Sequence, residues 1–403
     1  MIPRRLITNA TIVTPRGVIT DSALIIEKGR IAAIGPSESL ADSFAGDLEV
    51  VDVEGAYVMP GLIDLHTDTL EKEITPRPSA DFPIDVAVQE LDRKMIACGI
   101  TTVYHSLHFG YEEAELSNRS RYSRRDVLEG VRAMAGRHTL ARTRIHARYE
   151  IVGMGPQSLP IVQAALADGF IDLLSFMDHT PGQGQYTRGL FIERQAKQGI
   201  GEEEALRRLA EKQARPRLSP AEMQEVATRA LNLGIPIASH DDDTEEKVRQ
   251  MHALGVTICE FPINLHSARI ARELGMEVLG GASNVLRGGS LTGNLNVTDA
   301  IKDGSVNGLC SDYYPPAMLH AVFKLWNSQV QPLHEAVASA TLVPARAAGI
   351  GRETGSLEVG KDADLIVVRL RDRTPYVTQT YVRGERVHTA GRELQPQPAV
   401  ALA

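Results

Sequence analysis

The chain has 403 residues, 43% of them hydrophobic, which is enough for one large domain with a smaller one beside it. Charged residues make up 23% and the formal net charge is −8, which argues against a protein that wraps nucleic acid or covers an anionic membrane. No apolar run reaches the length of a membrane span or a signal peptide, and the three cysteines form no CxxC pair. We therefore expect a cytoplasmic protein with reduced thiols.

The two ends of the chain share one pattern, that of short strands separated by glycine turns. Residues 1–58 contain LITNATIV, ALIIEKGRIAAIG and LEVVDVEGAYV, and residues 350–395 contain DADLIVVRLRDRTPYVTQTYVRGERVHTAGREL. Two β-rich ends around a different middle predict one small β-sandwich domain, built from residues 1–58 and 350–395.

Residues 59–349 alternate apolar strand candidates with segments of helical period. The strand candidates are GLIDLH, GITTVYHSL, RIHARYEI, IDLLSFMDH, IPIASH, VTICEFP, MEVLGGAS and VNGLCSD. Eight strands that alternate with helices predict an α/β fold, a (β/α)₈ TIM barrel. A charged helical insertion at about residues 186–218 is either a lid or a solvated hairpin.

Polar residues end seven of the eight strand candidates. In chain order they are His66, Asp68, His105, Glu150, His179, His240, Glu260 and Asp312. A barrel of this kind gathers the carboxyl ends of its strands on one face, where catalytic groups lie. Imidazole and carboxylate are ligands of zinc and similar divalent metals, so one metal centre accounts for the whole set.

Further residues are candidates for contact with an anionic small-molecule substrate. They are Lys72, Arg77, His105, Asn284, Arg287, Gly288 and Gly289. The loop LRGGSLTGN offers backbone N–H groups for an anion nest, with Arg287 supplying charge. Ordinary surface charge is the alternative for Lys72 and Arg77, and a structural role is the alternative for His105 and for the nearby His108.

The arrangement resembles the amidohydrolase superfamily, in which an HxD or HxH on the first strand is followed by a bridging acid, two His and a final Asp. More narrowly, HTDTLEK with TPRP, FMDHTPGQGQ, ASHDDDT, GGASNVLRGGS and CSDYYP resemble the PhnM family. These are the ribose 1-methylphosphonate 5-triphosphate diphosphatases of bacterial phosphonate breakdown. The resemblance runs along nearly the whole chain and implies hydrolysis of the triphosphate to the 5-phosphate and pyrophosphate.

The resemblance also implies two divalent metal ions, with zinc as first choice and iron, manganese or nickel as alternatives. The ligands would be His66, Asp68, Glu150, His179, His240 and Asp312. Glu150 would bridge the ions, with Glu260 as the reserve candidate. Water shared by the ions would form a hydroxide nucleophile at neutral pH, and Asp312 would accept its proton.

Four positions depart from the pattern expected of the PhnM family. Thr69 stands in place of Asn, Ser283 in place of Pro, Leu291 in place of His and Gly184 in place of Arg. The last two remove possible phosphate contacts and leave the metal ligands untouched. A sister hydrolase acting on an amide, a cyclic imide or another phosphorylated compound is therefore an open alternative, as is a non-enzymatic barrel. The sequence also leaves open a homo-oligomer.

Overall fold

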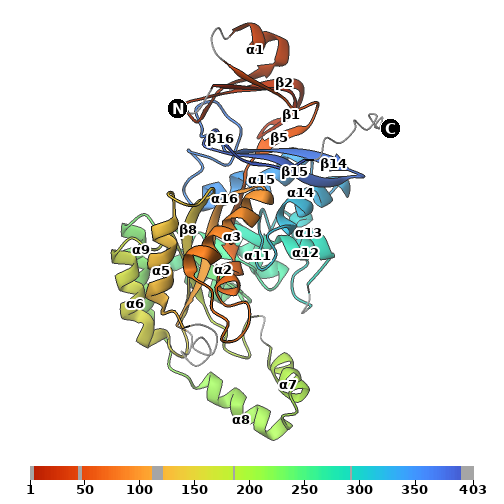
Figure 1. Ribbon diagram of the computed structural model, residues 1–403. Coiled ribbons are helices and arrows are strands. Elements are labelled where there is room, and N and C mark those ends of the chain that lie inside the picture. The colour runs from red at the N-terminus through yellow and green to blue at the C-terminus, as the bar shows by residue number, and fades with distance from the viewer. Residues whose placement is uncertain (1–3, 44–47, 111–120, 185–186, 291–292, 392–403) are drawn as a thin grey trace.

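The computed structural model describes residues 4–43, 48–110, 121–184, 187–290 and 293–391. It contains two sheets, one curled into a barrel inside a ring of helices and one beyond an end of that barrel (Figure 1). Within the described ranges, no helix has the length and hydrophobicity that crossing a membrane would require.

The barrel sheet is parallel, with the strand order β13-β12-β11-β10-β9-β8-β7-β6. Its strands are β6 (Leu62–Thr67), β7 (Ile100–Phe109), β8 (Arg142–Glu150), β9 (Leu173–Met177), β10 (Ile237–His240), β11 (Ile258–Glu260), β12 (Glu277–Gly281) and β13 (Gly308–Cys310). A bridge between Thr67 and Asp312 joins the first strand to the end of the last. The eight predicted strands and the α/β barrel are thus confirmed.

Helices follow the strands and cover the outside of the barrel (Figure 1). They are α2 (Thr69–Ile74), α3 (Ile84–Ala97), α5 (Arg124–Met134), α6 (Gly155–Ala167), α9 (Pro220–Asn232), α10 (Glu245–Ala253), α11 (Leu265–Glu273), α12 (Ala282–Arg287), α13 (Val297–Asp303), α14 (Ala317–Asn327), α15 (Leu333–Ser339) and α16 (Leu342–Ala347). The largest apolar core lies between the strands and these helices and includes Leu62, Val103 and Val278. A second core fills the barrel interior around Ile63, Leu65 and Tyr104.

The second sheet is mostly antiparallel and takes strands from both ends of the chain. They are β1 (Arg5–Thr14), β2 (Gly17–Glu27), β3 (Arg30–Pro36), β4 (Glu49–Asp52), β5 (Tyr57–Pro60), β14 (Leu365–Arg371), β15 (Thr374–Val382) and β16 (Glu385–Thr389), with α1 (Ser37–Ser43) after β3. The two ends meet where β5 pairs with β14, for example at Val58 and Val367. The predicted assembly of one small β unit from both termini is confirmed.

The predicted insertion forms a hairpin of two helices, α7 (Arg188–Lys197) and α8 (Glu202–Gln213). Figure 1 shows this hairpin reaching out from the barrel on the side away from the terminal sheet. Helix α7 has no buried residue and α8 buries only Ala205 and Leu209, so the hairpin packs chiefly on itself. We call residues 188–213 the helical arm.

Arg142, at the start of β8, joins the barrel to the segment that precedes β14. Its guanidinium lies 2.8 Å from a carboxylate oxygen of Asp364 and also pairs with Asp362. The side chain of Asp364 is fully buried, and burial raises its pKa. The carboxylate therefore depends on Arg142 for compensation of its charge.

Replacing Arg142 with Ala should lower the free energy of unfolding by about 3–5 kcal/mol, because it leaves a buried carboxylate without its cationic partner. The matched control is Arg30→Ala, which removes a 62% exposed side chain that lies 3.6 Å from Asp362. The control should cost less than about 1 kcal/mol. Urea unfolding followed by circular dichroism measures both, and equal effects would contradict this account.

Candidate metal centre

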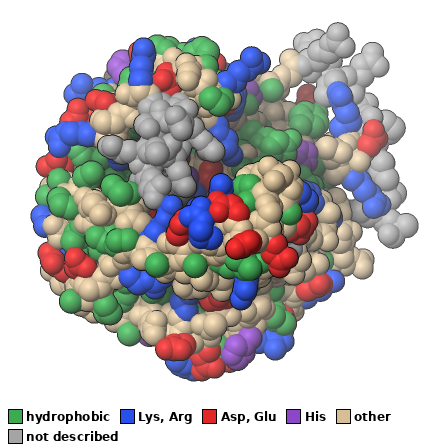
Figure 2. Space-filling model, turned by 90° about the horizontal axis from the view of Figure 1, so that it is seen from below, with side chains coloured by type: hydrophobic (Ala, Val, Ile, Leu, Met, Phe, Trp, Pro, Cys, Tyr) green, Lys and Arg blue, Asp and Glu red, His purple; other side chains and the backbone are tan. Residues whose placement is uncertain are grey.

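The polar strand ends meet on the barrel face that points away from the terminal sheet. Figure 2 looks onto this face and shows basic and acidic side chains around a recess. Among the described residues, three groups there have ligand atoms within 4.8 Å of one another. They are His66 with Asp68 and Asp312, His179 with His240 and Asp241, and His66 with His146 and Glu260.

The first group forms where the first and last strands of the barrel meet. The Nε2 atom of His66 lies 3.6 Å from an oxygen of Asp68, so the two side chains converge as their spacing on β6 predicts. Asp312 follows β13 and is held by backbone hydrogen bonds, with its N–H donating to His66 and its carbonyl accepting from Asp68. Barrel closure thus places Asp312 beside the HxD motif.

The second group lies on the neighbouring strands β9 and β10. The Nε2 atom of His179 is 3.8 Å from an oxygen of Asp241, and the Nδ1 atom of His240 is 3.3 Å from the same oxygen. Glu150, at the end of β8, adjoins this group, because its carboxylate is 2.7 Å from Nδ1 of His179 and accepts from the His179 backbone N–H. The ring centres of His66 and His240 are 5.3 Å apart, so the two groups share one site.

The third group lies deeper and supports the first. Glu260 is fully buried, and its carboxylate is 3.1 Å from Nδ1 of His66, on the side of the ring away from Asp68. His146 lies behind it, with Nδ1 2.9 Å from the Leu65 carbonyl and Nε2 2.8 Å from the Ser175 hydroxyl. A carboxylate on one ring nitrogen fixes the orientation of a metal-ligating histidine. The structure therefore places Glu260 in contact with His66, where it can orient the ring.

The donor set fits divalent metal ions, since the imidazole nitrogens and carboxylate oxygens of each group lie within 4.8 Å of one another. Three residues just past strand ends also adopt left-handed backbone conformations, namely Asp241 (φ 55°), Phe261 (φ 53°) and Asp312 (φ 62°). Such conformations are sparsely populated by residues other than glycine and recur at functional sites. Here the left-handed conformations of Asp241 and Asp312 direct their carboxylates into the site.

The electrostatics of the site agree with a cluster of charged ligands. Burial lowers the pKa of His66, but the Glu260 carboxylate outweighs burial and raises the pKa to about 9. Burial also opposes ionisation of Asp68, yet Arg148 and His66 hold its pKa well below the usual range. Burial raises the pKa of Asp312 to about 6. Asp312 is thus a much stronger base than Asp68, which suits a proton acceptor.

Sequence reasoning missed Arg148, which is buried at the barrel mouth. Its Nη1 atom donates to Asp68 at 2.5 Å and to Nε2 of His108 at 2.9 Å. His108 in turn lies 2.6 Å from Glu71, which accepts from Arg124 at 2.7 Å. Strand alternation could have revealed Arg148. Residues 146, 148 and 150 share one side of β8, and Glu150 is a predicted residue of the site.

His105 requires a correction, because the structure does not bring its side chain into the mouth. On β7 it shares a side with Val103 and Leu107, which pack in the core between the strands and the helices. Its Nδ1 atom is buried without a hydrogen-bond partner, and burial lowers its pKa to about 4. The strand continues to Phe109, two residues further than predicted, so His108 occupies the position expected of His105.

The other predicted substrate contacts lie around the rim. Lys72 is exposed on α2 near enough to Asp312 to lower the pKa of that carboxyl, and Arg77 is exposed in the following loop. Arg287 donates to the hydroxyl of Tyr313 at 2.9 Å. The Asn284 side chain donates to the Leu295 carbonyl at 3.0 Å and accepts from the Val297 N–H at 3.1 Å. These two hydrogen bonds stabilise the loop.

The structure also places the two predicted glycine contacts and three of the four residues that depart from the family pattern. Gly288 and Gly289 have φ values of 86° and 156°, as a tight glycine turn requires. Gly184 donates its N–H to Asp243 at 2.9 Å. Thr69 is 3.0 Å from the hydroxyl of Thr67, Ser283 donates to the Ser311 carbonyl at 3.4 Å, and Leu291 lies outside the described residues.

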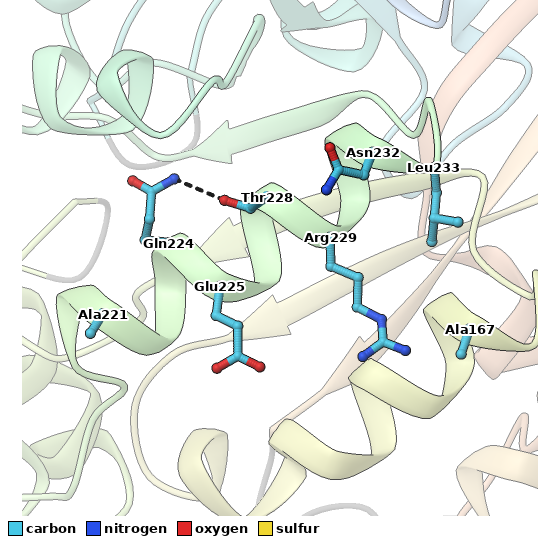
Figure 3. Close-up of a pocket in the computed structure, with 8 residues that line it drawn as sticks. All are labelled: Ala167, Ala221, Gln224, Glu225, Thr228, Arg229, Asn232 and Leu233. Atoms are coloured by element: carbon cyan, nitrogen blue, oxygen red, sulfur yellow. Dashed lines mark hydrogen bonds between the residues drawn. The ribbon is translucent and has the colours of Figure 1, made fainter.

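A hollow of about 620 Å³ also lies on the outer face, between α6 and α9 (Figure 3). Figure 3 shows Glu225 and Arg229 on α9 facing Ala167 on α6. It also shows the hydrogen bond that the Gln224 side chain donates to the Thr228 hydroxyl. Its described lining contains a single carboxylate and no histidine or cysteine. We therefore place the functional site at the barrel mouth.

Comparison with known proteins decides the family. The model of the amidohydrolase family matches residues 57–387, which span most of the chain. The chain belongs to the amidohydrolase family. This amidohydrolase is 32% identical to the alpha-D-ribose 1-methylphosphonate 5-triphosphate diphosphatase of Escherichia coli (strain K12), over 95% of this chain and 100% of that protein. It is also 26% identical to the imidazolonepropionase of Rhizobium meliloti (strain 1021), over 88% of this chain and 86% of that one.

Among solved structures, the amidohydrolase shares its fold with N-acetylglucosamine-6-phosphate deacetylase from Pasteurella multocida. The TM-score is 0.62 at 16% identity, and the match covers 95% of this chain and 99% of that chain. Family membership, the full-length relative and the convergent donor groups together make this amidohydrolase a metal-dependent hydrolase.

Proposed function

We propose that this amidohydrolase cleaves α-D-ribose 1-methylphosphonate 5-triphosphate into the 5-phosphate and pyrophosphate. The observation that carries the proposal is the 32% identity to the Escherichia coli diphosphatase over 95% of this chain and 100% of that protein. The basic rim supports an anionic substrate, because Lys72, Arg77 and Arg287 lie at or near the mouth of a chain whose formal net charge is −8.

The donor groups support a centre of two divalent ions, with zinc as first choice. His66 and Asp68 would hold one ion and His179 and His240 the other, with Glu150 and Asp312 as the further proposed ligands. Such a centre would lower the pKa of bound water towards neutrality and would polarise the phosphoryl group.

The residues of this chain perform the remaining steps. Glu260 holds Nδ1 of His66, so that Nε2 faces Asp68 and Asp312. Asp312, whose pKa burial raises to about 6, accepts the proton of the attacking water. Water adds to phosphorus, the bond to the pyrophosphate leaving group breaks, and the proton passes to that group. Lys72 and Arg287 stabilise the negative charge that develops on the phosphoryl oxygens.

One observation favours a second candidate, a sister hydrolase that acts on a cyclic imide or another phosphorylated compound. Gly184 lies beside the second donor group, where a Cβ would be 3.2 Å from that of Asp241, and it brings no cation to the site. A relative named imidazolonepropionase also matches over 88% of the chain. The product formed from a ribose triphosphate distinguishes the two candidates.

The test of the proposed function is pyrophosphate release from the ribose triphosphate by metal-loaded protein. Elemental analysis should find about two divalent ions per chain, since two donor groups meet at the site. A chelator should remove the ions and reduce the release of pyrophosphate to background, and added metal should restore it. Metal-free protein that retains full activity would refute the metal centre, and metal-loaded protein that releases no pyrophosphate would favour the second candidate.

A further inference from the structure

A cleft of about 90 Å³ opens beside the second donor group, and two elements far apart in the sequence line it. The barrel contributes Glu150 and His179, which belong to the proposed metal centre. The helical arm contributes Lys212 from the last turn of α8, and the segment after it contributes Arg215. Two basic side chains, one from the arm and one from the segment after it, thus line the same small space as the metal-ligand candidates.

The segment that carries these side chains is fixed to the barrel. Residues 216–218 run antiparallel to residues 151–153, the continuation of β8, with Gly153 N–H donating to the Pro216 carbonyl at 2.8 Å. Leu218 N–H donates to the Ile151 carbonyl at 2.8 Å. At the end of α8, the Gln213 side chain donates to the Pro181 carbonyl at 2.9 Å. The base of the arm is therefore held on both sides of the cleft.

The fit around Arg215 is close. A Cβ added at Gly153 would lie 3.8 Å from both Cδ and Nη1 of Arg215, so the arginine side chain passes directly over this glycine. Gly153 has a φ of 75°, a conformation that favours glycine. The Arg215 side chain therefore lies within van der Waals range of the turn that follows Glu150.

Charge balance indicates what the cleft would bind. The second donor group is acidic on its inner side, with Glu150 and Asp241 both at hydrogen-bond or ion-pair distance from His179. Gly184 adds no cation on that side of the mouth. Lys212 and Arg215 line the same cleft and bring positive charge to it, which matches an anion that extends from the metal centre into the cleft.

We propose that Lys212 and Arg215 form a subsite for the distal phosphate groups of the substrate, so that the helical arm and the segment after it determine polyphosphate specificity. The proposal rests on the proposed diphosphatase function for the identity of the substrate. The subsite itself requires only a polyphosphate chain. On this account the arm supplies the positive charge that Gly184 does not.

The experiment compares Lys212→Gln, Arg215→Gln and the double variant with the unchanged protein, all metal-loaded. The matched control is Arg207→Gln on the same helix, which removes a 59% exposed arginine that pairs with Glu204 and Glu211. Inorganic tripolyphosphate is titrated calorimetrically into each sample, and metal content is measured before and after to detect stripping. Pyrophosphate release from the ribose triphosphate then gives kcat and KM separately.

Each single variant should bind tripolyphosphate about tenfold more weakly, as expected for one lost hydrogen bond to a charged group, and the double variant about a hundredfold more weakly. KM should rise by similar factors with kcat much less affected, and Lys212→Arg should retain most of the affinity. The control should match the unchanged protein.

Unchanged tripolyphosphate affinity in the double variant, or no binding by the unchanged protein, would overturn the subsite. A double variant that fails to fold would shift the test to Lys212→Gln, which removes the positive charge, and Lys212→Arg, which retains it. Failure of the proposed function gives a different result. In that case the unchanged protein binds tripolyphosphate and loses affinity in the variants, but releases no pyrophosphate from the ribose triphosphate.

Discussion

Replacing Asp312 with Asn should lower kcat by at least about 10²-fold, the low end for a positioned acid–base group. Asp312 lies beside the HxD motif because Thr67 and Asp312 pair across the closed barrel, and its N–H donates to His66 at 3.0 Å. Burial raises the pKa of this carboxyl to about 6, so a substantial fraction is ionised at neutral pH and its basicity is high. An amide keeps the shape but cannot accept the proton.

The measurement is kcat for pyrophosphate release, with metal content determined on the same sample, because Asp312 is also a proposed ligand. The control is Asp299→Asn on α13, which removes an exposed carboxylate 66% accessible to solvent and should leave kcat unchanged. A variant of Asp312 that keeps its metal and its kcat would refute the assigned role. A variant that loses its metal would instead identify Asp312 as a ligand whose absence disrupts the centre.

The barrel could be predicted because its strands are buried on both faces and end on polar residues. Segments such as GLIDLH and IPIASH are short apolar runs with helical segments between them, which is typical of parallel strands covered by helices. The helical arm could be predicted as helix from its charged 3.6-residue pattern. Its position beside the metal centre could not, because that depends on pairing between residues 151–153 and 216–218, more than sixty residues apart.

The candidate site was predicted where strand spacing alone determines which side chains converge. His66 and Asp68 meet as alternation requires. His105 was misplaced because both faces of β7 are buried and each carries a histidine, so the pattern does not say which face turns inward. Arg148 was missed because a cation among metal ligands is unexpected until its contacts with Asp68 and His108 are seen.

Glu150→Gln and Glu260→Gln should affect the metal centre very differently, although both remove a carboxylate from a strand end. Glu150 lies 2.7 Å from Nδ1 of His179 and lines the cleft beside the second donor group. Glu260 is fully buried and holds Nδ1 of His66 from behind. Glu150→Gln should therefore lose at least one of the two proposed ions after dialysis.

Glu260→Gln should keep both ions after dialysis but bind them about 10–100-fold more weakly, the usual cost of removing a carboxylate that orients a ligating histidine. An amide still bonds to the ring but no longer fixes which nitrogen of His66 carries the proton. Elemental analysis measures occupancy and competition with a chelator measures affinity, with thermal unfolding recorded to confirm that each variant is folded. If Glu260→Gln loses its metals and Glu150→Gln retains them, the bridging carboxylate is Glu260, and the second donor group must be built without Glu150.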